Sequence, residues 1–237
     1  MRLDKYLTQC TELTRSLAGA AIRQGRVRVN EKVIKSSSLK INELTDVVLL
    51  NGQSLTDKIG PRYFMLHKPE GYICANSDNE HAVVFELLSR EINLDKLHTV
   101  GRLDIDTTGL VLISDDGQWS HAITSPKHHQ NKSYRVWLSE PLIEDAEQQV
   151  KKGMMLRDEL HPTKPGTLER INDTEVILTI SEGRYHQVKR MFAALGNRVV
   201  KLHRHSIGDV VLDENLHEGE YRVLTPQEVA LLGKSSK

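Results

Sequence analysis

A polar, glycine-bearing stretch at residues 51–61 divides the chain into two segments, and each segment has enough apolar residues for a core of its own. The stretch runs from Asn51-Gly52 to Gly60-Pro61, and glycine and proline are the residues that most strongly interrupt helices and strands. A length of 237 residues also fits two modest domains. We therefore predict a small module with its linker at 1–60 and a larger domain at 61–237.

The first segment has the pattern of two helices followed by a hairpin. Leu3, Leu7 and Cys10 fall on one face of a helix, and Thr14 is placed to cap a second helix that Gly25 ends. Short alternating strands are predicted after these helices, at 27–29, 33–34 and 46–50.

The larger segment is dominated by strands, with few helices between them. Leu110-Val111-Leu112-Ile113 is a continuous apolar run, which is typical of a fully buried strand. The helices do not alternate regularly with the strands, so we predict the α+β class with a mixed or largely antiparallel sheet. Further strands are expected at 63–66, 133–138, 174–180, 199–202, 210–212 and 221–224, with helices at 83–88, at 183–195 and from 226 onward.

The chain has no net charge, but its charges are unevenly distributed. Residues 1–40 hold nine lysines and arginines against three acids, and residues 183–208 hold six against none. Segregated basic segments favour a polyanionic partner, although a solvated basic face has the same pattern. The basic residues expected to contact this polyanion are Arg23, Arg26, Arg28, Arg102, Lys127, Lys132, Arg184, Arg190 and Arg204.

Several functional classes lack their sequence signals. Nowhere do 18 apolar residues run together, and the N-terminus has no apolar signal core. There is no P-loop, no dinucleotide-binding fingerprint and no CxxC pair, and Cys10 and Cys74 fit small core residues. The close histidine pairs, His128-His129 and His203-x-His205, lack an HExxH motif or cysteine partners. We therefore expect a cytoplasmic protein without a membrane segment, a metal or a small-molecule cofactor.

The segment most suggestive of chemistry reads Gly-Arg-Leu-Asp-Ile-Asp-Thr-Thr-Gly-Leu, from Gly101 to Leu110. It places Arg102, Asp104 and Asp106 on a short loop before a buried strand, and rigid scaffolds present reactive groups from such loops. The two aspartates could instead only cap turns and pair with Arg102. An aspartic protease needs its Asp-Thr/Ser-Gly motif twice, and a glycosidase needs two carboxylates across one cleft, so the sequence favours neither class.

Two other clusters carry reactive residue types. Residues 182–192 read Glu-Gly-Arg-Tyr-His-Gln-Val-Lys-Arg-Met-Phe, a predicted helix that buries Val188 and leaves Lys189 and Arg190 near its start. A plain basic amphipathic helix has the same pattern. The third cluster is Lys132-Ser133-Tyr134, on a predicted strand.

Together these motifs resemble those of the pseudouridine synthases that modify bacterial ribosomal RNA and carry an N-terminal S4 module. The family's catalytic loop, Gly-Arg-Leu-Asp-x-Asp-Thr-x-Gly-Leu, matches residues 101–110, and its Lys-x-Tyr strand falls on Lys132 and Tyr134. Its Glu-Gly-Arg-x-x-Gln-Val-Lys/Arg-Arg-Met helix falls on 182–191, and 64–72 resembles its opening strand and turn. The helices and hairpin of the first segment resemble the S4 RNA-binding module, so the resemblance covers essentially the whole chain.

The resemblance implies a reaction and a role for three residues. Pseudouridine forms when the N1–C1′ bond of a uridine breaks and the uracil turns and rejoins through C5, with no redox change. Asp104 would be the catalytic carboxylate, as nucleophile or as base, and Tyr134 would stack on the flipped uracil. Lys189 would keep Asp104 ionised, with Arg190 as the alternative cation.

The resemblance is strongest to members that act on the small ribosomal subunit. It implies a monomer that isomerises one uridine of 16S rRNA, the one at position 516, in free RNA or in a partly assembled subunit. Two alternatives stay open, namely a uridine of the large-subunit RNA and a non-catalytic assembly factor that only binds ribosomal RNA.

Overall fold

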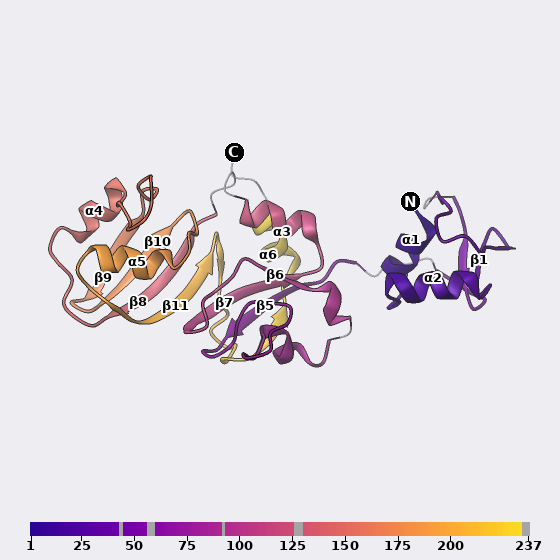
Figure 1. The fold of residues 1–237 in the computed structure, drawn as a ribbon, viewed down its shortest axis with the longest axis horizontal. Helices are drawn as coiled ribbons and strands as arrows, with labels where there is room; N and C mark the ends of the chain where they lie inside the picture. Colours follow the sequence, from indigo (N-terminus) through magenta and orange to yellow (C-terminus); the bar gives the residue numbers. More distant parts are fainter. Residues whose placement is uncertain (43–44, 56–59, 92, 126–129, 234–237) are drawn as a thin grey trace. The chain divides into compact units, whose positions relative to one another are not determined.

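The structure, a computed structural model, describes residues 1–42, 45–55, 60–91, 93–125 and 130–233 (Figure 1). It divides into two compact units, the first formed by Met1–Pro61 with Glu91–Asn93 and the second by Arg62–Arg90 with Leu94–Lys237. The α+β class is confirmed, because helices accompany antiparallel and mixed sheets. None of the helices in the described part of the chain has the length and apolar character of a membrane span.

The first unit packs two helices on a small antiparallel sheet. Helix α1 (Leu3–Cys10) buries Leu3, Leu7 and Cys10, as predicted, and the core continues into α2 (Arg15–Arg23). The Thr14 hydroxyl accepts a hydrogen bond from the Leu17 amide at 3.3 Å, so the predicted cap is confirmed. The sheet has the order β2 (Lys32–Val33), β1 (Val27–Val29), β3 (Val48–Leu50) and β4 (Gln53–Ser54).

The linker expected from residue 51 begins later than predicted. Asn51 and Gly52 have φ angles of 53° and 81° and form the tight turn between β3 and β4, where left-handed residues suit a two-residue hairpin. Strand β4 therefore belongs to the sheet of the first unit, and 56–59 lie outside the described residues.

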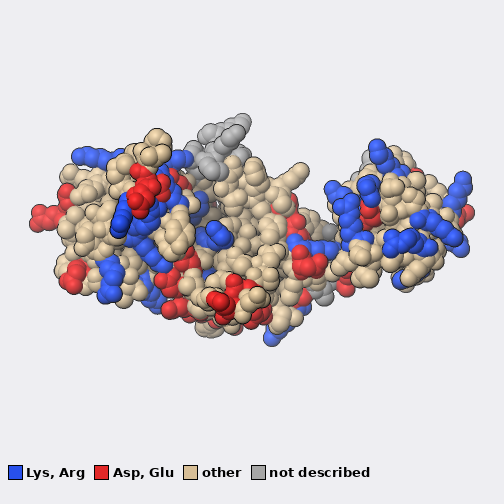
Figure 2. Space-filling view, viewed as in Figure 1, with Lys and Arg blue, Asp and Glu red and all other residues tan. Residues whose placement is uncertain are grey.

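The first unit presents a basic surface. Arg23, Arg26 and Arg28 are exposed around the end of α2 and along β1, and Arg26 is steadied by a 2.9 Å hydrogen bond to the Asn51 side chain. Lysine and arginine cover much of the visible face of this unit (Figure 2). Such a surface suits the phosphates of a polyanion.

The second unit is built on one long sheet. Among its described strands, β7 and β11 pair in parallel and the other neighbours are antiparallel, which is the mixed sheet expected. Its order is β13 (Tyr221–Val223), β5 (Tyr63–Lys68), β7 (Thr107–Ser114), β11 (Val199–Ile207), β8 (Lys132–Leu138), β10 (Glu175–Ile180) and β9 (Thr167–Asn172), with β6 (His98–Val100) on β7 and β12 (Val210–Val211) on β11.

The sheet separates two cores, and β7 contributes to both. Val111 and Ile113 point into the larger core and Leu110 and Leu112 into the smaller one, so the whole apolar run is buried. The larger core lies under α5 (Gln187–Ala194), α4 (Ala146–Lys152) and the 3₁₀ turn at Val84–Leu88. The smaller core lies under α3 (Gly117–Thr124) and α6 (Pro226–Gly233). A second 3₁₀ turn spans Leu94–Lys96.

Three features of the second unit differ from the predictions. Helix α5 begins at Gln187 rather than at Gly183, because 183–186 form a turn that ends with His186 in the left-handed region. Helix α3 was not predicted, and the Asp116 side chain caps its start by accepting hydrogen bonds from the amides of Gln118 and Trp119. Helix α4 and strand β9 were not predicted.

Candidate active site

Two carboxylates and one ammonium meet where the loop at 101–106, between β6 and β7, approaches the start of α5. The Lys189 ammonium lies 3.1 Å from an Asp104 carboxylate oxygen and 2.6 Å from one of Asp106. Lys189 is on the first turn of α5, whose apolar face holds Val188 and Met191 in the larger core. The buried helix face therefore fixes the lysine over the loop.

Asp104 is also contacted from its other side. Nε2 of His186 lies 3.5 Å from Asp104 Oδ1, while Lys189 approaches Oδ2. The Asp104 side chain is 31% exposed and that of Asp106 is 54% exposed. Asp104 is thus the more enclosed of the two carboxylates, held between a histidine and a lysine.

The Lys189 ammonium and the Asp106 carboxylate stabilise each other's charged forms. Partial burial works to lower the pKa of Lys189, but hydrogen bonds to Asp106 and Asp104 and their charges outweigh it, and the pKa is raised. Burial likewise opposes the charge of Asp106, and Lys189 overcomes it and lowers the pKa of that carboxyl. The cluster therefore holds an ammonium and at least one ionised carboxylate at neutral pH.

A buried lysine fixes the loop from beneath. Lys68, at the end of β5, has no exposed surface, and its ammonium donates to the carbonyls of Pro69, Ile105 and Thr107 at 3.0, 3.3 and 2.7 Å. Burial lowers its pKa, and nearby acidic groups offset part of that shift. Because two of these carbonyls flank Asp106, Lys68 sets the path of the loop that carries both aspartates.

Arg204 connects the same loop to strand β7 from inside the protein. Its side chain is buried, at 4% exposure, and Nε donates to the Leu110 carbonyl at 2.8 Å and Nη1 to that of Arg102 at 3.5 Å. Nη2 of Arg204 is buried as well and has no hydrogen-bond partner among the described residues. The structure therefore presents no exposed guanidinium at this position, and the RNA contact of Arg204 stays a prediction.

Gly109 is required where β7 meets β11. Its φ is +106°, and a Cβ built there would lie 2.3 Å from the Arg204 carbonyl oxygen, a backbone atom of the paired strand. Gly109→Ala should therefore lower the free energy of unfolding by about 3 kcal/mol, measured by denaturant melting. Gly117→Ala is the matched control, because no atom lies within 4 Å of its Cβ. Equal stability of the two variants would contradict the close approach.

The other basic residues expected to contact RNA have different surroundings in the structure. Arg102 is exposed on the loop itself. Arg190 pairs with Glu159 at 2.8 Å, so Lys189 and not Arg190 reaches the carboxylates. Arg184 donates to the carbonyls of His161 and Pro162 and pairs with Glu159 and Glu182. Lys127 lies outside the described residues.

The tyrosine strand, β8, contributes to the larger core. Tyr134 is mostly buried and shares the larger core with Leu103 and Val188, which precede Asp104 and Lys189 in the chain. Lys132, on the same strand, is partly buried, and its ammonium donates to the Gln130 carbonyl at 2.7 Å. Burial, followed by the charges of Arg204 and Lys164, lowers the pKa of Lys132 to about 8.

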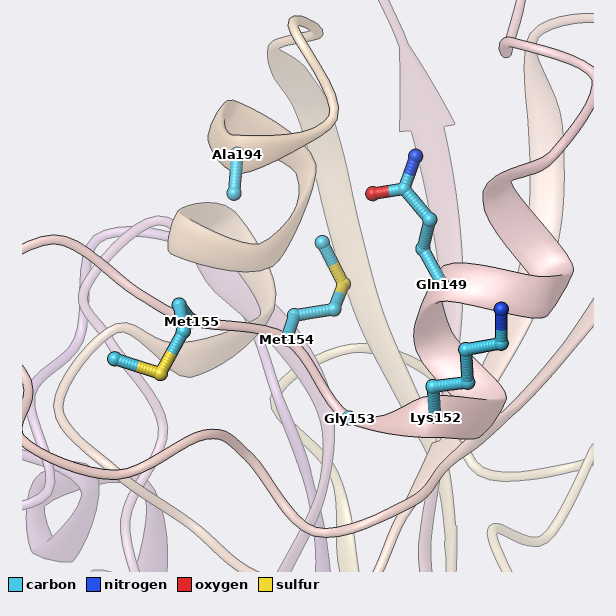
Figure 3. A pocket seen from close by; sticks show the side chains of 6 residues that line it. All are labelled: Gln149, Lys152, Gly153, Met154, Met155 and Ala194. Carbon is cyan, nitrogen blue, oxygen red and sulfur yellow. The ribbon is translucent and has the colours of Figure 1, made fainter.

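A separate hollow does not coincide with this cluster. It measures about 340 Å³ and is lined by Gln149, Lys152, Gly153, Met154, Met155 and Ala194, from α4, the loop after it and the end of α5 (Figure 3). Its lining contains no carboxylate. Within the described ranges, no group of three or more His, Cys, Asp or Glu side chains could hold a metal ion.

Sequence reasoning missed Lys68 and His186 as parts of the site. Lys68 occupies a strand position before Pro69, and its burial depends on loop carbonyls some 40 positions along the chain, which no local pattern reveals. His186 lies within the motif at 182–191, but only its left-handed backbone turns it toward Asp104.

Comparisons with known proteins agree with these motifs. The family model described as RNA pseudouridylate synthase matches residues 62–194, and the S4 domain model matches residues 1–48. The chain is 53% identical to ribosomal small subunit pseudouridine synthase A of Salmonella typhimurium, over 98% of this chain and all of that one. The protein of the same name from Escherichia coli K12 is 52% identical, over 97% and 99% of the two chains.

A solved structure shows the same fold. The crystal structure of a pseudouridylate synthase superposes with a TM-score of 0.70 at 51% identity and covers 98% of this chain and 99% of its own. The resemblance drawn from the four motifs is thus confirmed by sequence and by structure. The chain belongs to the RNA pseudouridylate synthase family, as an S4-domain isomerase that acts on RNA.

Proposed function

We propose that the protein isomerises a single uridine of 16S rRNA, at position 516, with Asp104 as the reactive carboxylate. The observation that carries the role of Asp104 is its enclosure between Lys189 at 3.1 Å and His186 at 3.5 Å. The small-subunit substrate is supported by the names of the relatives that match over nearly the full chain. Acting on ribosomal RNA, the protein would work in the cytoplasm.

The residues at this site suit the bond changes that pseudouridine formation requires. The N1–C1′ bond of the uridine breaks, a C5–C1′ bond forms, the C5 hydrogen leaves to solvent and N1 gains a proton. Asp104, beside the Lys189 ammonium, attacks the nucleotide or abstracts a proton from it, and Tyr134 offers a ring to the extruded uracil. The reaction has no redox step, and no cofactor enters it.

Release of hydrogen from C5 gives a direct test of this function. Unmodified 16S and 23S transcripts that carry tritium at C5 of uridine are incubated with the protein, and tritium in water is counted. We expect release from one uridine per 16S molecule and none from 23S RNA. Release from 23S RNA alone would establish the large-subunit alternative, and no release from either would leave a binding factor.

Removal of residues 1–60 should weaken RNA binding and leave the catalytic domain folded. The first unit has its own core and the exposed Arg23, Arg26 and Arg28, so its loss removes phosphate contacts and reduces the slope of log Kd against log salt. Filter binding at several salt concentrations measures the slope, and a thermal melt measures folding. A truncated protein without a cooperative melt would show that the boundary at residue 60 is wrong.

A further inference from the structure

Tyr185 is an aromatic side chain that the fold leaves uncovered beside the carboxylate cluster. Tyr185 is 75% exposed, whereas every other Phe, Tyr and Trp, all of them in the described part of the chain, is buried or half-buried. A large apolar ring left in water contributes nothing to the core. Its position next to His186 connects it to the site.

The ring is held in place rather than free. It stacks on the His186 ring with centroids 3.8 Å apart and planes 20° apart. The Tyr185 carbonyl accepts a hydrogen bond from Arg190 at 3.2 Å, and Arg190 is itself fixed by Glu159 at 2.8 Å. One face of Tyr185 is therefore covered by histidine and the other is open.

His186 ties this stack to the reactive carboxylate. Its Nε2 lies 3.5 Å from Asp104, and its backbone is left-handed, with φ 46° and ψ 35°. Non-glycine residues adopt that conformation at a cost, and such strain is retained where a side chain must be aimed. The Tyr185 ring therefore has a fixed position, because it stacks on the ring of His186, and His186 contacts Asp104.

We propose that the open face of Tyr185 is a stacking site for the nucleobase that neighbours the target uridine in the RNA, an inference that rests on the proposed function. Flipping a uridine out of its strand leaves the adjacent base without a stacking partner on one face. An aromatic ring of fixed orientation replaces that partner. Base–aromatic stacking changes RNA affinity by about 5-fold to 150-fold when the ring is truncated.

The test is a double-mutant cycle between protein and RNA. Filter binding measures the Kd of each pair, and the rate of turnover is not part of this measurement. The RNA is a 16S fragment that spans position 516, with all bases present or with an abasic site immediately 5′ or 3′ of the target. Tyr185→Ala should weaken binding of the intact fragment at least 5-fold, and Tyr185→Phe should bind as wild type. Val223→Ala, which truncates another exposed side chain on the edge strand β13, is the matched control.

At one of the two abasic positions, wild type should lose affinity while Tyr185→Ala loses none further, because the same contact is already missing. Additive losses at both positions, or equal Kd values for Tyr185→Ala and wild type, would overturn the stacking site. A role confined to holding His186 would lower kcat and leave Kd unchanged, which also overturns it. If the double-mutant cycle gives the expected coupling but the protein releases no tritium from C5 of uridine, only the proposed function is overturned.

Discussion

Asp104→Asn is expected to lower the saturated rate of pseudouridine formation by at least ~100-fold while the Kd for RNA stays within a few-fold of wild type. An amide has the shape of the carboxylate but is neither a nucleophile nor a base of comparable strength. The variant should fold normally, because Asp104 is partly exposed and its loop is held by Lys68 and Arg204. Single-turnover measurements at saturating RNA separate the rate from binding.

Asp106→Asn is the matched control for this substitution. Asp106 lies on the same loop and is closer to Lys189 than Asp104 is, but its side chain is more exposed and only Asp104 contacts His186. We expect a milder loss of rate in Asp106→Asn. If Asp104→Asn kept more than about one hundredth of the wild-type rate and Asp106→Asn did not, the reactive carboxylate would be Asp106.

Lys189→Met should also lower the saturated rate, by about 100-fold to 1,000-fold. The substitution leaves Asp104 and Asp106 next to each other without the cation that now lies within 3.1 Å of both. A carboxylate that loses its counter-charge keeps its proton to higher pH, so the acid limb of the pH–rate profile should move upward. Rates measured between acid and neutral pH test both effects.

Lys189→Arg is the control that retains the charge. Since the carboxylates raise the pKa of Lys189, its ammonium is charged in the working pH range, and an arginine preserves that charge. The loss should therefore be much smaller than in Lys189→Met. A normal saturated rate in Lys189→Met, with weaker binding and a salt slope reduced by about one, would mean that Lys189 only contacts phosphate.

Local patterns predicted the elements whose signal lies in a few neighbouring residues. The run Leu110–Ile113 lies in the buried strand β7, and the helix expected from 226 onward is α6, where Thr225 and Glu228 form a capping box with hydrogen bonds of 3.2 and 2.7 Å. The proximity of Lys189 to the aspartate loop was implied by the family resemblance and not by a local pattern, and the structure brings them together.

Features set by distant contacts could not be predicted in this way. Arg204 was expected to contact RNA as part of a basic segment, yet the carbonyls of Leu110 and Arg102, about 100 positions away, accept its hydrogen bonds inside the protein. The late start of α5 has a similar origin, because Arg184 is held by carbonyls at 161–162 and the chain turns before the helix begins. The spacing of apolar residues along the sequence predicts neither the contacts of Arg204 nor those of Arg184.

The measurement that tests the central claim most directly is carbodiimide-stop mapping of pseudouridine in 16S and 23S transcripts after incubation with the wild-type protein and with Asp104→Asn. Primer extension after this treatment stops one nucleotide 3′ of each pseudouridine. We expect one new stop, which reports position 516 of 16S RNA, with wild type and none with Asp104→Asn. A stop in 23S RNA, no stop in either RNA, or an equal stop with Asp104→Asn would contradict it.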